Sequence, residues 1–369
     1  DAPKRPSSMA MANMYDFGGM HMLAESRTPD ELLSAKKLGD LGVLKAKLQF
    51  CYADDKCKDV LDKIAQHRIT CMPVFAKRGS PSFGACQQLM QDAFRRCVPA
   101  LETIPKEEVV GIIDVIDVVK LIARLHGDTR GYPSPTRYAI EWVEWNHATV
   151  EEALVQRKRT PFVLPATASV LDAARVLIDT RIPRILVRDK EGNISNVITQ
   201  SDLVTMLSGH TQVLDPKVLH KPISTFRHIK NKTKDPNHVL KVDKNARAIE
   251  AFRMMDYGDV SAVPVVDSER DNKLVANISA RDIRGIIAEE SDFPMSLYTQ
   301  TALQFAQRMH ARKDTHAPLA VSLKLSDTFK DAITKLNELK IHRVWIVNDA
   351  EQVTHVLALC DILGEIIEP

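Results

Sequence analysis

The stretch "NVITQSDLV" at residues 196–204 decides the fold, because similar stretches occur at three other places in the sequence. It has the pattern of a strand that runs into a helix, with a hydroxyl residue, Thr199, three positions before Asp202. Similar stretches are "ANISARDIR" (276–284), "GIIDVIDVV" (111–119) and "HVLALCDIL" (355–363). When the four are aligned, their aspartates fall at residues 117, 202, 282 and 361, at intervals of 85, 80 and 79 residues. A fixed interval of this size indicates a chain built from four repeats.

The same order of elements recurs around each aspartate. Apolar residues at i, i+3, i+4 and i+7 predict amphipathic helices over residues 57–68, 169–181, 246–258 and 328–340. Apolar runs predict a strand after each helix, at residues 71–75, 184–188, 262–266 and 344–348. A polar turn, a second strand that ends at the aspartate, and a further helix complete the unit. Since such a unit cannot bury both faces of its small sheet alone, we expect the units to pair.

The repeats divide the chain into five segments. We predict an N-terminal arm (1–34), repeat 1 with an insertion at about 77–107 (35–126), repeat 2 with its preceding linker (127–210), a basic linker with repeat 3 (211–290), and repeat 4 (291–369). In the linker before repeat 2, Thr149 and Glu152 have the spacing of a helix-starting capping box. The Lys-rich run at 215–236 is interpreted mainly as a solvated connector, in preference to a dedicated anion or partner site.

Composition limits the class of protein. The 369 residues are 44% hydrophobic and 27% charged, and no run of 18 apolar residues occurs, so a soluble protein with no membrane partner is expected. A net charge of +2 argues against nucleic acid as an obligatory partner. The six cysteines include no C-x-x-C pair, which predicts a reduced, cytoplasmic compartment and no metal site. The chain starts at Asp1, so a targeting segment that preceded it cannot be read.

These four units resemble cystathionine-β-synthase (CBS) repeats, because each has the aspartate of the family's pattern apolar–x–Ser/Thr–x–x–Asp and two of them also have its hydroxyl residue. CBS repeats pair into two Bateman modules, so the resemblance implies an α/β (α+β) fold in which four repeats form a pseudo-symmetric disc. The stretches "VSAVPVVD" (260–267) and "IHRVWIV" (341–347) are similar to the gamma (Snf4-type) subunit of AMP-activated protein kinase. The resemblance covers residues 35–369 apart from the insertion.

The resemblance also implies a ligand, an adenine nucleotide (AMP, ADP or ATP) without a metal. The aspartate would accept hydrogen bonds from the two ribose hydroxyls, and the hydroxyl residue would contact sugar or phosphate. Repeats 2 and 3 keep both residues, as Thr199 with Asp202 and Ser279 with Asp282. Repeat 4 keeps Asp361 but has Ala358, and repeat 1 keeps Asp117 but has Asp114, a carboxylate that would repel phosphate.

The phosphate-binding residues that the resemblance implies are also incomplete. The family's His-Arg pair is present in repeat 4 as His342 and Arg343, and its serine is present in repeat 3 as Ser261. Repeat 2 has Pro183 in place of the histidine but keeps Arg184, and repeat 1 has Thr70 in place of an arginine. One or two sites are therefore expected to bind nucleotide.

Each candidate residue also has a simpler interpretation. An aspartate between a strand and a helix is often a helix cap, and this interpretation is preferred for Asp117, whereas ligand binding is preferred for Asp202 and Asp282. Thr199 and Ser279 suit either role, since strand-end hydroxyls often bond to nearby backbone. His342 alone would be an ordinary packed or surface histidine, and only its place in the repeat suggests a ligand.

No catalytic motif is present, and the repeats fill the chain, so an enzyme is not expected. The leading hypothesis is a non-catalytic, adenine-nucleotide-sensing regulatory subunit of a kinase or of a larger complex. The alternative is a structural or adaptor protein whose nucleotide sites are degenerate or permanently occupied. A regulator of a metabolic enzyme or transporter is a third, less favoured, possibility.

Overall fold

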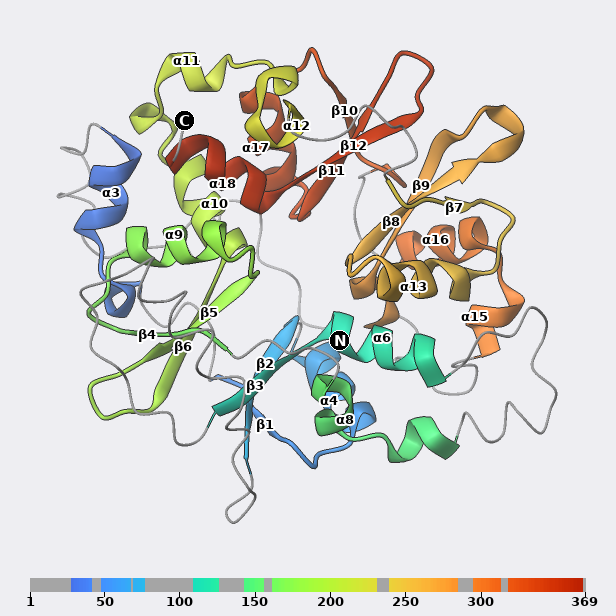
Figure 1. Cartoon of the computed structure of the whole chain (residues 1–369), viewed down its shortest axis with the longest axis horizontal. Coiled ribbons are helices and arrows are strands. Elements are labelled where there is room, and N and C mark those ends of the chain that lie inside the picture. The colour runs from blue at the N-terminus through green and yellow to red at the C-terminus, as the bar shows by residue number, and fades with distance from the viewer. Residues whose placement is uncertain are drawn as a thin grey trace, which may run out of the picture.

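The protein is described by a computed structural model that covers residues 28–41, 48–67, 69–76, 109–125, 143–155, 161–230, 239–284, 295–312 and 318–367. These residues contain four three-stranded sheets, one in each predicted repeat. The repeats form a ring in the order 1, 2, 4, 3 (Figure 1). The α/β fold of four paired repeats is therefore confirmed. The predicted insertion at 77–107 lies outside the described residues.

Every repeat has the same elements in the same order. Repeat 1 consists of β1 (Cys51–Tyr52), α4 (Cys57–Gln66), β2 (Cys71–Phe75), β3 (Val109–Asp114) and α6 (Val115–Leu125). Repeat 2 consists of β4 (Val163–Pro165), α9 (Val170–Asp179), β5 (Arg184–Arg188), β6 (Ile194–Thr199) and α10 (Gln200–Ser208). In both repeats the predicted helix before the middle strand, α4 or α9, and the middle strand itself, β2 or β5, are present within two residues of the expected bounds.

Repeats 3 and 4 continue the pattern. Repeat 3 consists of β7 (Val242–Asp243), α13 (Ala248–Tyr257), β8 (Ala262–Asp267), β9 (Lys273–Ser279) and the short 3-10 helix η8 (Ala280–Ile283). Repeat 4 consists of β10 (Ser322–Lys324), α17 (Phe329–Glu338), β11 (Arg343–Val347), β12 (Val353–Ala358) and α18 (Leu359–Ile367). In all four sheets the middle strand pairs parallel with the first and antiparallel with the third, and the antiparallel pair shifts register near its far end.

One prediction about these strands needs correction. The last strand of each repeat ends three residues before the aspartate, and the aspartate lies in the first turn of the helix that follows. The reason is local: Thr199 and Ser279 cap the helix, so the chain turns at the hydroxyl residue.

Paired repeats exchange their leading helices. Helix α3 (Pro29–Ala35) precedes repeat 1 but joins repeat 2, where the Leu38 N–H donates to the Ala168 carbonyl. Helix α8 (Val150–Val155) precedes repeat 2 but joins repeat 1, where the Cys57 N–H donates to Ala148. Its predicted capping box is confirmed, since the Thr149 N–H donates to Glu152 at 2.7 Å.

Repeats 3 and 4 exchange in the same way. Helices α15 (Met295–Thr299) and α16 (Ala302–Ala311) precede repeat 4 but join repeat 3, where the Ala302 N–H donates to Ala246 at 2.7 Å. The segment with α11 (Pro216–Leu219), the 3-10 helix η5 (Ile223–Thr225) and α12 (Arg227–Lys230) precedes repeat 3 but joins repeat 4. Each pair is therefore an intertwined module.

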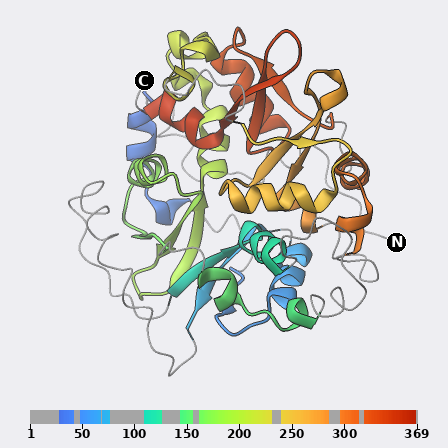
Figure 2. The ribbon, with the colours of Figure 1, turned by 45° about the vertical axis from the view of Figure 1, so that its right-hand side comes forward.

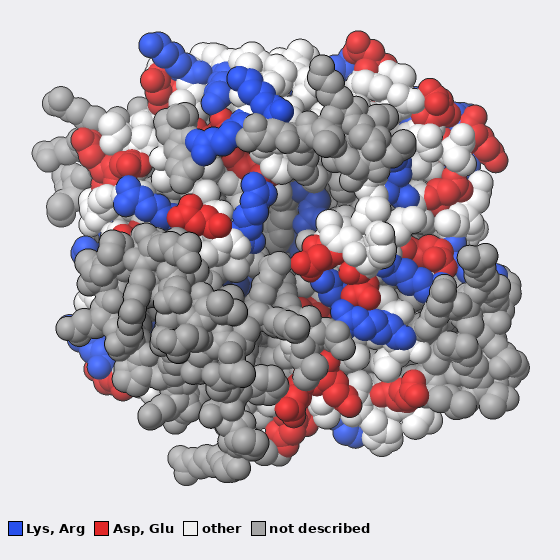
Figure 3. Space-filling model, viewed as in Figure 1, with Lys and Arg blue, Asp and Glu red and all other residues white. Residues whose placement is uncertain are grey.

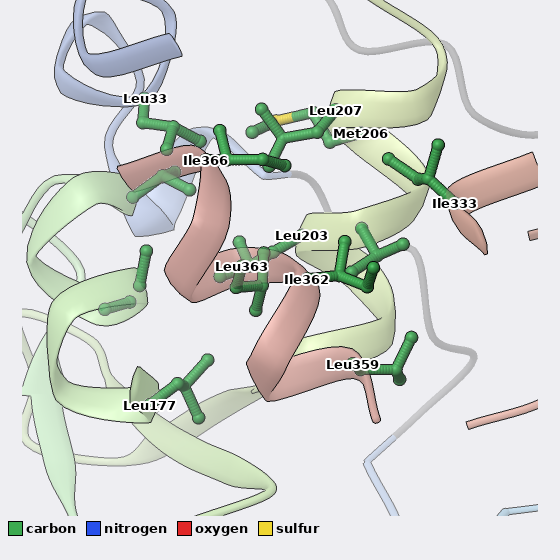
Figure 4. Close-up of a cluster of buried hydrophobic side chains, with 14 of the residues drawn as sticks. Leu33, Leu177, Leu203, Met206, Leu207, Ile333, Leu359, Ile362, Leu363 and Ile366 are labelled. Atoms are coloured by element: carbon green, nitrogen blue, oxygen red, sulfur yellow. The ribbon is translucent and has the colours of Figure 1, made fainter. Parts of the chain in front are cut away.

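Helices connect the two modules. Helix α6 of repeat 1 packs on α13 of repeat 3, and the two helices lie side by side in both ribbon views (Figures 1 and 2). Helix α18 of repeat 4 packs against α9 and α10 of repeat 2, and Leu363 and Ile362 lie beside Leu203 of α10 (Figure 4). Consequently one hydrophobic cluster joins repeats 2 and 4 and a second joins repeats 1 and 3.

Burial corrects the prediction of a solvated connector and shows that the end of the predicted arm packs into a core. Ile223 and Phe226, in the run interpreted as a solvated connector, are fully buried in the core shared by repeats 2 and 4. Residues 231–236 of that run lie outside the described residues. Leu32 and Leu33, at the end of the predicted arm, are also fully buried, and residues 1–27 lie outside the description. Both segments are held because their apolar side chains complete a core.

No helix in the described part of the chain combines the length and the apolar character that a membrane span requires.

Candidate functional site

The four aspartates occupy equivalent positions at the start of the last helix of each repeat. In every repeat, the backbone N–H of the strand's last residue donates to Oδ2 of the aspartate three residues later. The donors are Asp114, Thr199, Ser279 and Ala358, and the distances are 2.8, 2.8, 2.7 and 2.9 Å. The aspartates Asp117, Asp202, Asp282 and Asp361 therefore all have the helix-capping role that the simpler interpretation describes. A ligand role for the second oxygen stays a prediction.

The hydroxyl residues are also drawn into the caps. Thr199 Oγ1 and Ser279 Oγ donate to the Oδ2 of Asp202 and Asp282, at 2.8 and 2.9 Å. In repeat 4 the second oxygen of Asp361 already has protein neighbours: Oδ1 lies 3.2 Å from His228 Nδ1 and 3.7 Å from Arg181 Nη1. Repeats 2 and 3 have the same cap geometry, whereas in repeat 4 the aspartate is approached by Arg181 of repeat 2 and by His228 of α12.

A second set of equivalent positions lies where each middle strand begins. In repeats 2, 3 and 4 the preceding helix ends in a left-handed residue, Arg181, Asp259 or Lys340, with φ of 53°, 48° and 53°. This turn redirects the chain into the strand. The first strand residues, Cys71, Arg184, Ala262 and Arg343, lie opposite the last residues of the third strands, Asp114, Thr199, Ser279 and Ala358. The predicted basic residues are thus held next to the helix caps.

Six side chains from all four repeats meet at these positions, and we call them the central cluster: Asp114, Arg184, Ser261, Arg281, His342 and Arg343. Arg184 Nη2 lies 2.7 Å from Asp114 Oδ2, which connects repeats 2 and 1. Arg343 Nη2 donates to Ser261 Oγ at 2.5 Å, and Arg281 Nη1 lies 3.0 Å from His342 Nε2, which connects repeats 4 and 3. On the face that Figure 3 shows, basic and acidic side chains are mixed near the middle of the molecule.

The charges of the central cluster act on each other. Burial, then the charges of Arg281 and Arg343, lower the pKa of His342 to about 3, so the imidazole is neutral at pH 7 and its Nε2 accepts from Arg281. Burial and Arg281 lower the pKa of Arg343 to about 10, which leaves it charged. Burial also lowers the pKa of Arg281. Arg184 experiences the charges of Asp114 and Asp117, and Arg281 those of Asp282 and Asp114. Arg281 and Arg343 repel each other, so an anion bound between them would be favoured.

Arg184 is the most enclosed of these cations. Burial alone would lower its pKa, but the charge of Asp114, together with smaller effects of Cys71 and Asp117, outweighs burial and raises the pKa. Both side chains are about nine-tenths buried, with 9% of the Arg184 side chain and 12% of the Asp114 side chain exposed. Within the described residues, no hydrogen bond reaches the Nε and Nη1 of Arg184. Nε and Nη1 therefore keep donor capacity beyond the contact with Asp114, although the Cys71 thiol also lies near the guanidinium and contributes to its raised pKa.

The structure brings together four predicted phosphate-binding residues, Arg184, Ser261, His342 and Arg343. It adds Arg281, which the sequence reasoning missed. Arg281 lies inside the repeat 3 motif, between Ser279 and Asp282, and a basic residue there has no counterpart in the other repeats. His228, which approaches Asp361, was missed as well, because it belongs to the run interpreted as a connector.

Among the described residues, no group of three or more His, Cys, Asp or Glu side chains is arranged to hold a metal ion.

Comparisons with known proteins agree with this geometry. A model of the CBS domain matches residues 150–209 and 233–289. The SNF1-related protein kinase regulatory subunit gamma-1 of Arabidopsis thaliana is 27% identical over 180 residues, which are 47% of this chain and 42% of that protein. The gamma-1-like subunit of the same plant is 26% identical over 230 residues, 58% of this chain and 48% of that protein. The chain thus matches about half the length of these relatives.

A solved structure extends the likeness to most of the chain. The crystal structure of a Methanocaldococcus jannaschii protein, proposed as an archaeal homolog of g-AMPK, covers 86% of this chain and 96% of its own, with a TM-score of 0.56. At 15% identity, this likeness shows the fold alone.

Proposed function

We propose that this protein is a non-catalytic regulatory subunit that binds an adenine nucleotide. The chain contains CBS domains and is homologous to the gamma regulatory subunits of SNF1-related and AMP-activated protein kinases. The partner would be a kinase or a larger complex that contains one. The homology supports the regulatory role, and the site supports the ligand.

The central cluster carries this proposal. Arg184, Arg281 and Arg343 come from three repeats. Asp114 acts on Arg184 and Arg281, together with Asp117 and Asp282, whereas Arg343 is buried beside the like charge of Arg281. An excess of buried cations is costly unless an anion compensates it. A nucleotide phosphate would supply that anion, and arginine suits it because its planar fork donates two parallel hydrogen bonds.

The aspartates would bind the sugar. Each uses Oδ2 for its helix cap, which fixes the carboxylate and directs it by a hydrogen bond of 2.7 to 2.9 Å. A carboxylate held in this way is preorganised to accept hydrogen bonds from a vicinal diol. Asp202 and Asp282 are the strongest candidates, since the Asp361 Oδ1 is already approached by His228 and Arg181.

Regulation would follow from the ring. The central cluster contains residues of all four repeats, so a bound phosphate touches both modules at once. A ligand that binds one arrangement of the modules more tightly than another shifts the population between them, and a partner kinase would respond to that shift.

Calorimetric titration of the full chain with AMP, ADP and ATP tests the binding. We expect heat with at least one of the three, and Asp282→Asn should weaken that binding about tenfold or more, in line with the roughly 1.5–3 kcal/mol of hydrogen bonds to charged groups. No heat and no thermal shift with any adenine nucleotide would contradict the proposal.

Asp331→Asn is the matched control for the cap. Asp331 accepts from the Thr328 N–H at 2.8 Å in a capping box of the same form, at the exposed start of α17. Both variants disturb a helix cap, but only Asp282 belongs to a proposed ribose contact. If Asp331→Asn weakens binding as much as Asp282→Asn does, the effect is one of stability and the ribose assignment fails.

Two observations favour a second candidate, a structural CBS protein. Asp114 is paired with Arg184, and Asp361 Oδ1 is close to His228 and Arg181, so repeats 1 and 4 already satisfy part of their clefts with protein groups. A nucleotide that copurifies and does not exchange against excess free nucleotide would favour this candidate, whereas rapid exchange would favour the sensor.

A further inference from the structure

Asp114 is a carboxylate at a position where two other repeats have a hydroxyl. It is the last residue of β3 and corresponds to Thr199 in repeat 2 and Ser279 in repeat 3. Those hydroxyls close their own capping boxes. Asp114 instead extends out of its repeat to the Arg184 guanidinium of repeat 2, so the substitution has created a contact between repeats.

The Asp114–Arg184 contact has the features of an occupied oxyanion site. Its two atoms lie 2.7 Å apart, and both side chains are about nine-tenths buried. The other carboxylate oxygen, Oδ1, accepts from the Ile116 N–H at 3.3 Å, at the start of α6. The anion is thus held by an arginine and a helix N-terminus, which are also the groups that bind phosphate oxygens in proteins.

The charge of the Asp114 carboxylate acts on the other cations around the central cluster. Arg281, Arg284 and His342 all experience the charge of Asp114, so this one anion lies within electrostatic reach of the neighbouring cations. Within the described residues, the Nε and Nη1 of Arg184 make no hydrogen bond. The carboxylate therefore occupies the arginine on one side and leaves further donors available.

We propose that the Asp114 carboxylate stands in the place of a ligand phosphate in the central cluster and acts as a built-in competitor that weakens the binding of polyphosphate anions. The identity of the ligand as a nucleotide rests on the proposed function, but the competition itself requires only an anion. Because repulsion grows with ligand charge, Asp114 disfavours highly charged anions most strongly and makes the site selective for anions of low charge.

Titration of the full chain with inorganic pyrophosphate at low salt is the direct test. Asp114→Asn removes the charge and keeps the shape and the capping ability of the residue. We expect its pyrophosphate dissociation constant to fall by roughly tenfold or more relative to the unaltered chain, because unit charges a few ångströms apart in a protein interact at least this strongly. The gain should be smaller for orthophosphate, which carries less charge.

Asp256→Asn is the matched control. Asp256 also pairs across repeats, with Arg124 Nη2 at 2.6 Å, and its loss changes the net charge equally, but the pair belongs to the α6–α13 contact and not to the central cluster. An unchanged pyrophosphate affinity in Asp114→Asn, or an equal gain in Asp256→Asn, would overturn the proposal.

Two further measurements cover a loss of stability. Asp114→Asn leaves Arg184 buried without its counter-charge, which is destabilising; pyrophosphate should then raise the melting temperature of this variant by more than that of the unaltered chain, and an equal shift would count against the competition. In the double variant Asp114→Asn/Arg184→Gln the gain in affinity should disappear. If the gain persists, Arg184 is not the group that Asp114 occupies.

Titration with AMP separates this inference from the proposed function. A gain for pyrophosphate without any AMP binding would refute the nucleotide assignment and leave the competition intact. If AMP binds but the pyrophosphate affinities of the unaltered chain and Asp114→Asn are equal, the competition is refuted and the nucleotide assignment stands.

Discussion

At the scale of single residues, His342 makes the stability of the fold depend on pH. Burial, Arg281 and Arg343 lower the pKa of this imidazole to about 3 in the folded protein, whereas an unfolded histidine titrates near 6.5. Between these values the unfolded chain binds the extra proton, so the free energy of unfolding falls as the pH falls below about 6.5. The slope from this residue is at most about 1.4 kcal/mol per pH unit. We expect His342→Gln to flatten the dependence between pH 6.5 and 4.

Urea unfolding at pH 7, 6 and 5 measures that slope, and His220→Gln serves as the control because His220 is exposed and lies outside the central cluster. A His342→Gln variant with the same slope as the unaltered chain would show that other groups dominate acid sensitivity. At constant ionic strength, the difference between the two slopes reports the cost of protonating His342 inside the central cluster.

The residues of the candidate site show which features could be predicted from the sequence and which could not. The spacing of Asp117, Asp202, Asp282 and Asp361 predicted four equivalent carboxylates, because local sequence sets a helix start. The contacts between Arg184 and Asp114, or Arg281 and His342, join residues about 60 to 70 positions apart. Such pairs depend on how the ring closes, which no local pattern encodes.

At the scale of elements, the segment before repeat 3 shows how composition can mislead. Its lysines and histidines suggested a solvated connector, yet Phe226 is fully buried with its ring 6.0 Å from that of Phe329. The apolar residues are few but correctly spaced to dock on repeat 4. We predict that Phe226→Ala costs about 3–5 kcal/mol of unfolding free energy, since it removes an aromatic ring from the core.

Lys217→Ala, in the same segment, is the comparison for Phe226→Ala. Lys217 is exposed, and its substitution should change the free energy of unfolding by no more than about 0.5 kcal/mol. Chemical unfolding of both variants checks the assignment. If Phe226→Ala were as mild as Lys217→Ala, the segment would be a connector after all.

The exchange of leading helices between paired repeats could not be predicted from the sequence. The capping box at Thr149 and Glu152 correctly predicted where α8 begins, because a cap is a local signal. It could not indicate that α8 joins the repeat before it, since an apolar helix face fits either neighbour. The partner is fixed by contacts such as the Val150 N–H with the Asp55 carbonyl at 2.9 Å.

At the scale of the whole molecule, the two hydrophobic clusters predict how the chain behaves when it is cut. Each cluster draws residues from both sides of a break between Lys230 and Val239: one joins repeats 2 and 4, and the other joins repeats 1 and 3. The segment with Phe226 stays with the first half although it packs on repeat 4. Neither half can therefore bury its apolar helix faces alone. A large exposed apolar face favours association with another chain.

We predict that residues 1–234 and 235–369, expressed together with a tag on one half, copurify as a one-to-one complex that unfolds in a single transition. Expressed separately, each half should aggregate or bind the apolar dye ANS, because helices such as α18 would lose the partners that cover Ile362 and Leu363. Two halves that each stay monomeric and unfold cooperatively on their own would mean that the modules are independent. In that case the central cluster could not couple them, because coupling between modules requires that an arrangement of one depends on the other.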